Sequence, residues 1–359
     1  MNLKTLALPA LTVAAALFFT SCLDSVYCTS ASGTCYFHFG SGASQENVTG
    51  YSTQPLTDKN AGVKTAVIVI HGTQRNAGHY FETMAGIAKD RGLLGSVVVV
   101  APWFQCDLDK PAAGNLYFGC EDWKDGGPAV NDPTVYSFTV IDAIIAKMKG
   151  SFPNLARIIV TGHSAGGQFT QRYAAANTTD VNGLGMAVRY VPANPSSYVY
   201  LDDRRLKKTA VCADDTDCTL DAGSFEAPYW NAQSSEDCKK YNQYKYGLDG
   251  KDGYYIGPPL TAAQIAAQYV ARDVVYLLGS NDNGTDSEYD VLDKSCQADA
   301  QGPYMGDGGH SFRLQRGLTY YHYVKDLFAA GHALQIVPGC MHDEVCMYRS
   351  KEAVSAIFQ

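Results

Sequence analysis

The sequence predicts an α/β protein in which helices cover both faces of a mostly parallel sheet, with one inserted segment. Short runs of β-branched, apolar residues recur along the chain and have the length of buried strands. Segments with apolar residues at helical spacing separate these runs, and such alternation is typical of a parallel sheet. The 359 residues, 46% of them hydrophobic, suffice for one large core.

The first residues predict export. Lys4 precedes an almost wholly apolar stretch, residues 5–19, which is too short to span a bilayer and fits the core of a signal peptide. Residues 19–22, Phe-Thr-Ser-Cys, resemble the lipobox of bacterial lipoproteins. We therefore expect a signal peptide over 1–22, followed either by lipid attachment at Cys22 or by cleavage nearby that frees a secreted protein.

The charge pattern argues against nucleic acid as a partner. The formal net charge is -8 and the pI is about 5.4. Binding to nucleic acid needs Lys and Arg gathered on one face, and the densest basic run, residues 204–208, fits a solvated turn or helix start. Membrane contact is expected only through a lipid on Cys22.

The first half of the chain supplies the expected elements in order. Residues 23–60 are rich in Ser, Thr and Gly, and the alternating run 35–39 predicts an outer antiparallel strand. One large domain, 61–359, follows. It begins with buried strands at 64–70 and 96–101, separated by a helix that ends near Arg91, and continues with an amphipathic helix over 136–149.

The stretch from Ala156 to Arg172 organises the rest. An apolar strand breaks at Gly162-His163-Ser164-Ala165-Gly166 and resumes as a helix over 168–177. In this context G-x-S-x-G predicts a sharp turn that exposes the Ser164 hydroxyl beside a helix start, with small residues needed around it. The alternative is a Gly-rich surface turn without chemistry.

The second half contains the insertion and the end of the sheet. A short strand at 185–192 is followed by residues 193–269, where the strand and helix alternation lapses, and we expect a cap insertion there. Alternation returns with a strand at 273–279, a helix over 312–330, a strand at 333–338 and a final helix from about Glu344.

A nucleophilic Ser164 needs a base and a residue that orients this base. In proteins whose nucleophilic serine lies on a strand–turn–helix motif, the serine comes first along the chain, then the acid and then the histidine. Asp282 follows the strand 273–279 directly, although Asp286, Asp290 and Asp293 lie near enough to compete. His342 lies between the last strand and the last helix, whereas His310, His322 and His332 are expected on helices or the surface.

Two backbone amides should stabilise the negative charge that develops on the attacked carbonyl oxygen. The amide of Ala165, directly after the nucleophile, is the first candidate. The second is the amide of Thr73 or Gln74, in the loop after the strand 64–70, where Gly72 permits close approach of the backbone. An ordinary structural turn is the alternative for this loop.

Cysteine usage agrees with export. With Cys22 set aside, the other ten of the 11 cysteines form an even set, which is normally paired in an oxidising compartment. Connectivity does not follow from sequence, but neighbours suggest Cys28–Cys35, Cys106–Cys120, Cys212–Cys218 and Cys340–Cys346, which leaves Cys238–Cys296. No C-x-x-C or H-x-x-x-H spacing occurs, so a zinc site is not expected. Chemistry at an activated serine requires no cofactor or metal either.

The four motifs His-Gly-Thr-Gln-Arg-Asn at 71–76, Gly-His-Ser-Ala-Gly-Gly at 162–167, Leu-Leu-Gly-Ser-Asn-Asp at 277–282 and Pro-Gly-Cys-Met-His-Asp at 338–343 occur in this order. Together they resemble the α/β-hydrolase superfamily, specifically its secreted esterase branch near polyhydroxyalkanoate depolymerases and feruloyl esterases. The resemblance covers about residues 64–350 and implies a catalytic triad of Ser164, Asp282 and His342. The loop at 71–74 departs from the HGGG of many lipases.

These features predict a secreted or surface-anchored serine hydrolase that cleaves small or polymeric carboxylic esters. The alternatives are a peptidase or acyltransferase with the same triad, and a catalytically silent adhesion module. Trp123, His163 and Trp230 are the expected substrate contacts, together with Trp103 and the tyrosines of the insertion. The alternative interpretation is that these aromatic residues form the packed interior of the insertion and do not contact substrate.

Overall fold

The computed structural model describes residues 27–40, 46–178, 185–227, 241–257, 260–283 and 311–359. The expected signal peptide, Cys22 and the pair Cys238–Cys296 lie outside these ranges. None of the described helices has the length and hydropathy of a membrane span.

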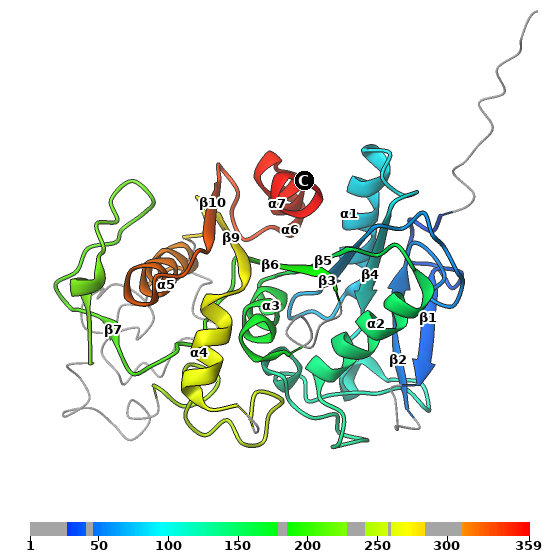
Figure 1. Ribbon diagram of the computed structural model, residues 1–359, viewed down its shortest axis with the longest axis horizontal. Coiled ribbons are helices and arrows are strands. Elements are labelled where there is room, and N and C mark those ends of the chain that lie inside the picture. Colours follow the sequence, from blue (N-terminus) through cyan, green and yellow to red (C-terminus); the bar gives the residue numbers. More distant parts are fainter. Residues whose placement is uncertain (1–26, 41–45, 179–184, 228–240, 258–259, 284–310) are drawn as a thin grey trace, which may run out of the picture.

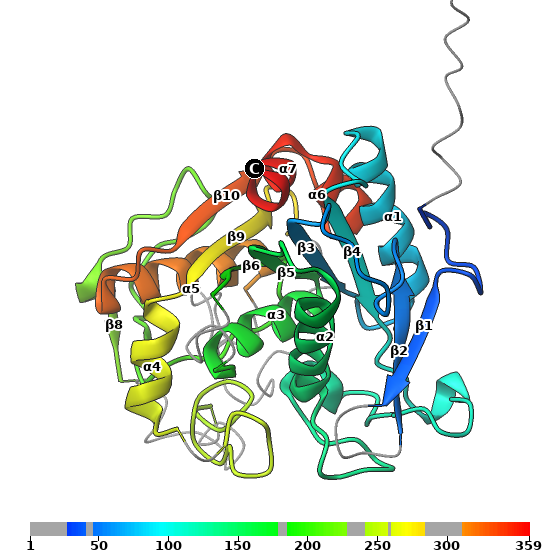
Figure 2. The same ribbon diagram turned by 45° about the vertical axis from the view of Figure 1, so that its right-hand side comes forward.

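An eight-stranded sheet with the order β1-β2-β4-β3-β5-β6-β9-β10 forms the centre of the molecule. Figure 2 shows it running from β1 at one edge to β10 at the other. From β4 to β10 all neighbours pair in parallel, whereas the pairs β1–β2 and β2–β4 are antiparallel. The strands are β1 (Tyr36–Gly40), β2 (Asn47–Ser52), β3 (Thr65–Ile70), β4 (Val97–Pro102), β5 (Arg157–His163), β6 (Ala187–Ala193), β9 (Asp273–Gly279) and β10 (Ala333–Val337).

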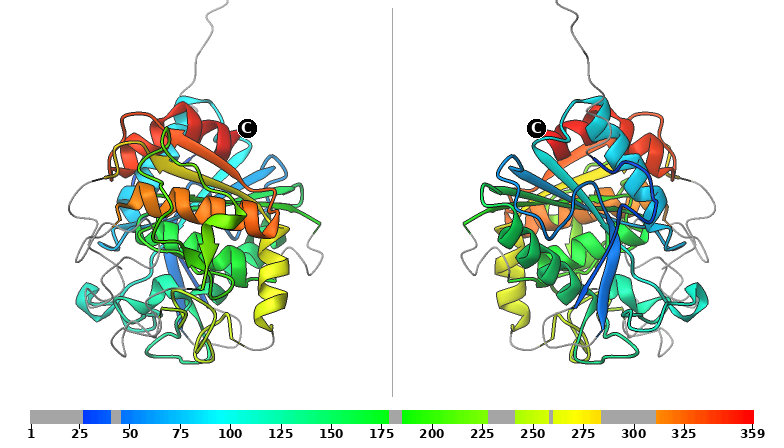
Figure 3. Two further views of the ribbon diagram at one scale, coloured as in Figure 1. Left: turned by 90° about the vertical axis from the view of Figure 1, so that its left-hand side faces the viewer. Right: turned by 90° about the vertical axis from the view of Figure 1, so that its right-hand side faces the viewer.

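Seven α-helices belong to the described residues: α1 (Ala77–Asp90), α2 (Ser137–Ser151), α3 (Ala165–Ala176), α4 (Ala262–Val270), α5 (Arg313–Phe328), α6 (Glu344–Arg349) and α7 (Lys351–Phe358). Helices α1, α6 and α7 lie on one side of the sheet and α2 to α5 on the other (Figure 1). The two views in Figure 3, from opposite ends, show the same three layers.

The alternation of side chains in β3 explains why both faces are covered. Ala66, Ile68 and Ile70 join the core under α2, α3 and α5, whereas Val67 and Val69 join the core under α1 and α7. Successive side chains of a strand point to opposite faces, so a strand that is apolar at every position must be buried on both. The predicted α/β class with a mostly parallel sheet is therefore confirmed.

The elements differ from the sequence prediction in three places. The outer strand predicted at 35–39 is present as β1, but its partner β2 was not predicted. Helix α4 lies inside the stretch 193–269 that we expected to be insertion, and it packs against α3 as a crossover helix. Its signal is the capping box of Thr261 and Gln264, in which the Thr261 hydroxyl accepts the Gln264 N–H. The final helix is divided into α6 and α7 at Ser350.

Two tyrosines in the described part of the insertion pack against a buried cation. Strand β7 (Arg205–Leu206) pairs with β8 (Phe225–Glu226). The Arg205 side chain is 1% exposed, and its guanidinium lies 4.0 Å from the ring centre of Tyr200 and 4.9 Å from that of Tyr241. For Tyr241 the packing interpretation therefore holds.

Four of the five predicted disulfides are present: Cys28–Cys35, Cys106–Cys120, Cys212–Cys218 and Cys340–Cys346. Each closes a short loop, which fits their identification from sequence neighbours. Such bonds persist in oxidising compartments.

Candidate active site

The turn between β5 and α3 holds Ser164 in a strained conformation. Its φ and ψ are 60° and -119°, a region that residues with a side chain rarely adopt. Crowding around the turn explains why glycine stands two residues before and two residues after Ser164. A Cβ atom on Gly162 would lie 2.3 Å from the Gly166 carbonyl oxygen, and one on Gly166 would lie 2.3 Å from the Ile70 carbonyl oxygen. The turn therefore fits only between residues without side chains.

Replacing Gly166 by alanine is expected to destabilise the protein by about 2–3 kcal/mol or more, because the new methyl group meets backbone atoms of β3 that cannot move independently. Urea unfolding measures this loss. Gly86→Ala in α1 is the control, since its Cβ would meet only the end of the Arg349 side chain at 3.6 Å. There we expect unchanged or slightly raised stability. Equal losses in both variants would contradict the close-packed turn.

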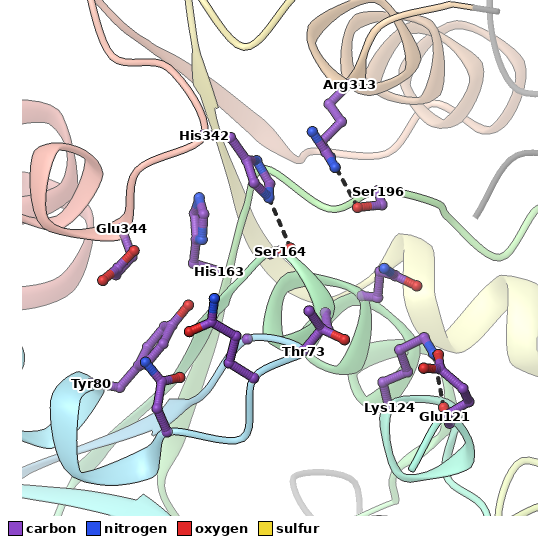
Figure 4. A pocket seen from close by; sticks show the side chains of 15 residues that line it. Thr73, Tyr80, Glu121, Lys124, His163, Ser164, Ser196, Arg313, His342 and Glu344 are labelled. Atoms are coloured by element: carbon purple, nitrogen blue, oxygen red, sulfur yellow. Dashed lines mark hydrogen bonds and ion pairs between the residues drawn. The ribbon is translucent and has the colours of Figure 1, made fainter. Parts of the chain in front are cut away.

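The structure brings Ser164, His342 and Asp282 together. His342, in the loop after β10, has Nε2 2.8 Å from the Ser164 Oγ and Nδ1 2.8 Å from Oδ2 of Asp282, in the loop after β9. Figure 4 shows the imidazole of His342 directed at Ser164. The carboxyl ends of parallel strands share one edge of the sheet, which explains how residues so distant in sequence meet.

Hydrogen bonds join the loop after β9, which bears Asp282 (the acid loop), to the loop after β10, which bears His342 (the histidine loop). The Asn281 N–H donates to the Cys340 carbonyl oxygen at 3.0 Å, and the disulfide Cys340–Cys346 flanks His342. Asn194, which is 1% exposed, accepts the Gly279 N–H at 2.8 Å and donates to the Met341 carbonyl oxygen at 3.3 Å. It thus links the end of β6 to both loops. The sequence analysis missed Asn194, because nothing near it in the chain marks this role.

A second unpredicted residue, Arg313, compensates the charge of Asp282. Both side chains are almost fully buried, at 3% and 1% exposure, and Nη1 of Arg313 lies 3.6 Å from Oδ1 of Asp282. Nε of Arg313 donates to Ser196 Oγ at 3.0 Å. The backbone also contributes, since Leu314 N–H donates to the Asp282 carbonyl oxygen at 3.1 Å. The start of α5 therefore holds the acid loop in place.

The predicted oxyanion residues line the same pocket as Ser164. The wall of this pocket, about 310 Å³ in volume, includes Gly72, Thr73, Gln74 and Ala165. The described part of the chain offers no acceptor to the N–H groups of Thr73 and Gln74. Ala165 opens α3, where backbone N–H groups are unpaired and the helix dipole favours negative charge.

The buried His71 side chain shapes the loop that bears Thr73. Its Nδ1 lies 2.9 Å from the Gly72 carbonyl oxygen and its Nε2 accepts the Phe104 N–H at 3.1 Å. This pattern requires the neutral imidazole with the proton on Nδ1. Burial lowers the pKa of His71 to about 4, which keeps the ring neutral at ordinary pH.

The burial of His71 predicts a pH-dependent part of the stability. Because the pKa is about 4 when folded and about 6.5 when unfolded, only the unfolded chain takes up this proton between these values. The contribution is complete above about pH 6.5 and falls by about 3 kcal/mol as the pH drops to 4. Unfolding of wild type and His71→Gln at both pH values measures it. The difference in free energy of unfolding between the two proteins should become smaller by this amount at pH 4. An equal difference at both pH values would refute the assignment of His71 as a buried neutral imidazole.

The predicted substrate contacts fare differently. His163 lies in the pocket wall, with its ring centre 4.5 Å from that of His342. Its pKa is held well below the usual value by burial and by the charges of His342 and Arg313. The assignment of Trp123 is wrong: among the described residues it does not belong to the pocket wall, and it packs against His71 and Phe104 in the core. Trp230 lies outside the described residues.

Two further histidines were placed on helices or the surface by the sequence analysis. His322 lies on α5, as predicted. The placement of His332 is wrong, because it is 5% exposed and lies between α5 and β10, where it contacts the hydroxyl of Tyr276 and the carbonyl oxygen of Tyr269. His310 and the competing acids Asp286, Asp290 and Asp293 lie outside the described residues.

One group of three metal-ligating side chains occurs within the described ranges, formed by Cys106, Asp107 and Cys120. Both of its sulfur atoms are joined in a disulfide and so offer no thiolate. This group therefore does not fit a metal ion.

No protein-family model and no curated protein matches the chain. Solved structures do. The poly(3-hydroxybutyrate) depolymerase LpqC from Bordetella parapertussis is 18% identical, with a TM-score of 0.56 over 89% of this chain and 92% of its own. Poly(aspartic acid) hydrolase-1 from Sphingomonas sp. KT-1 is 19% identical, with a TM-score of 0.56 over 90% of this chain and 98% of its own. With the sheet order and the strained turn at Ser164, these likenesses identify the fold of this chain as an α/β-hydrolase fold.

Proposed function

We propose that the chain is a serine hydrolase that cleaves carboxylic esters through an acyl-enzyme intermediate. The observation that carries this proposal is the continuous hydrogen-bonded row from Asp282 through His342 to Ser164, at 2.8 Å for each contact, which ends on a strained serine. A surface turn without chemistry has no need of a histidine and a buried carboxylate aligned on its hydroxyl.

Acylation would begin when Ser164 Oγ attacks the ester carbonyl carbon and His342 Nε2 accepts the hydroxyl proton. Asp282 holds the imidazole in the tautomer that leaves Nε2 free to accept. The carbonyl oxygen becomes negative, and the N–H groups of Ala165 and of Thr73 or Gln74 would stabilise it. His342 then returns the proton to the leaving alcohol.

Deacylation repeats these steps with water. His342 takes a proton from the water molecule, whose oxygen attacks the acyl carbon, and the proton passes to Ser164 Oγ as the acid leaves. The residues of this chain suffice for both halves of the reaction, so the proposed mechanism calls for no metal or cofactor.

The substrate class is proposed as small or polymeric esters. Of two similar structures, the poly(3-hydroxybutyrate) depolymerase is named for a polyester and supports this class, whereas the poly(aspartic acid) hydrolase is named for a polyamide and supports only a polymeric substrate. We further propose export, because residues 1–22 read as a signal peptide and the disulfides suit an oxidising compartment. A lipid on Cys22 would retain the protein at the cell surface; cleavage without lipid would release it.

A fluorophosphonate probe tests the proposal. Such probes react with activated serines, so we expect labelling of the wild type and none of Ser164→Ala. Hydrolysis of p-nitrophenyl esters but not of peptides would then separate an esterase from a peptidase. A wild-type protein that is folded, takes no label and cleaves no ester would be the silent adhesion module instead.

A further inference from the structure

The pocket above Ser164 has a polar wall. Its lining includes Gln74, Asn76, Lys124, Gln168, Ser196 and Arg313, while aliphatic side chains are represented within the described residues only by Ala165. An acyl chain gains affinity by burying hydrocarbon against hydrocarbon, at about 25 cal/mol per Å². Apart from Ala165 and the ring of Tyr80, this wall offers hydrocarbon mainly on side chains that also carry polar groups, so it can hydrogen-bond polar groups of a substrate.

Gln168 presents a fixed hydrogen-bond donor to the pocket. It lies one helical turn after Ser164 on α3 and is 1% exposed. Its Oε1 accepts from Nη1 of Arg172 at 3.1 Å and from Oγ of Ser197 at 3.0 Å. Because a guanidinium only donates, Oε1 must face Arg172, which turns the amide nitrogen of Gln168 toward the pocket. Within the described ranges, this Nε2 has no acceptor.

The orientation of Gln168 is anchored in the core. Arg172 is 0% exposed and its Nη1 lies 3.5 Å from Oδ1 of Asp125, while its Nη2 donates to Ser197 Oγ at 2.9 Å. The Ser197 hydroxyl, having accepted from Arg172, can donate to Gln168. Reversing the amide would bring its NH₂ group against the guanidinium and the Ser197 hydroxyl, so the donor is preorganised.

Lys124 brings a positive charge to the same wall. It belongs to the short helix η3 (Asp122–Asp125), next to Asp125, and its side chain is 3% exposed. Nζ donates to the Glu121 carbonyl oxygen at 2.9 Å and to the Glu121 carboxylate. That carboxylate belongs to a side chain that is 74% exposed. The buried ammonium of Lys124 is thus paired with a solvent-exposed carboxylate, and the carboxylate of a ligand can take the place of Glu121.

We propose that Gln168 Nε2 and Lys124 Nζ form a subsite for a carboxylate, so that the preferred substrates are esters that carry a free carboxylate besides the scissile bond. A carboxylate accepts from both donors and replaces the exposed Glu121 as the partner of Lys124. In Figure 4, Glu344, the other acidic residue of the wall, lies on the opposite side of Ser164 from Lys124. This inference rests on the proposed ester hydrolysis.

The test compares monoethyl adipate with ethyl hexanoate, and monoethyl succinate with ethyl butanoate, because each pair exchanges only a carboxylate for a methyl group. We expect kcat/KM of the wild type to be about 10- to 100-fold higher for the anionic member of at least one pair. Lys124→Met should reduce that ratio about tenfold, and Glu121→Gln should raise it because the competing carboxylate is gone. Lys149→Met, at an exposed position on α2, should leave both rates unchanged.

Three results are distinguishable. Ser164-dependent hydrolysis of both members at equal rates overturns the subsite and leaves the proposed function standing. If neither ester is cleaved and the fluorophosphonate does not label Ser164, the proposed function fails and this inference with it. If Lys124→Met does not fold, Glu121→Gln decides, because its carboxylate is exposed; an unchanged or lower ratio in that variant overturns the subsite.

Discussion

Ester turnover is expected to fall about 10⁶-fold in Ser164→Ala and in His342→Ala, and the double variant is expected to be no slower than either. In the proposed mechanism the serine hydroxyl attacks only when a base accepts its proton. This base is the imidazole of His342, whose Nε2 lies 2.8 Å from the Ser164 Oγ. Removing one partner therefore removes the contribution of the other. Initial rates with a p-nitrophenyl ester, at enzyme concentrations that exclude trace contamination, measure the loss.

The non-additivity separates a coupled pair from two independent contributions. Independent residues would multiply their losses and place the double variant far below either single one. His38→Ala serves as control, since His38 is exposed on β1 at the edge of the sheet, and it should keep kcat/KM within about twofold. Wild-type turnover in His342→Ala would end the assignment of the base.

Local signals in the sequence predicted the central elements of the site. The G-x-S-x-G turn required glycines at 162 and 166, and the structure shows backbone atoms 2.3 Å from where their side chains would begin. Asp282 and His342 were placed by a topological rule: both follow strands of a parallel sheet, and such strands end at one edge. The order of the strands indicated the two loops, but the choice of Asp282 within its loop was left open against Asp286, Asp290 and Asp293.

Contacts between distant segments could not be predicted in this way. Arg313 lies beside Asp282 because α5 begins there, and the residues between them give no indication of it. Asn194 joins the loops of Asp282 and His342 from the end of β6, in a stretch that we expected to belong to the insertion. The Trp123 prediction failed for a related reason: an aromatic residue in a long loop looks available for substrate until the core that covers it is known.

The second large effect concerns the acid. Asp282→Asn is expected to lower kcat about 10⁴-fold while leaving the three side chains near their present positions. The carboxylate accepts the Nδ1 proton of His342, which leaves Nε2 without one. An amide can turn its NH₂ group toward Nδ1, and this stabilises the opposite tautomer, whose Nε2 carries a proton and cannot accept another from Ser164.

The same substitution removes the negative charge beside Arg313. A buried cation that loses its partner destabilises a protein by about 3–5 kcal/mol, so unfolding must be measured together with turnover. A folded but slow Asp282→Asn protein assigns the loss to the tautomer, whereas an unfolded one would assign it to the ion pair.

The chain offers a matched control for the acid. On the outer side of α5, Oδ2 of Asp326 lies 2.8 Å from Nδ1 of His322, the same contact as between Asp282 and His342. Among the described residues, no serine hydroxyl is hydrogen-bonded to the other nitrogen of this ring. Asp326→Asn should leave kcat/KM within about twofold. If both substitutions slow the enzyme equally, the carboxylate acts through the general charge of the protein and not by orienting His342. A loss of kcat/KM in Asp282→Asn alone would show that the Asp282 carboxylate acts by holding the proton on Nδ1 of His342.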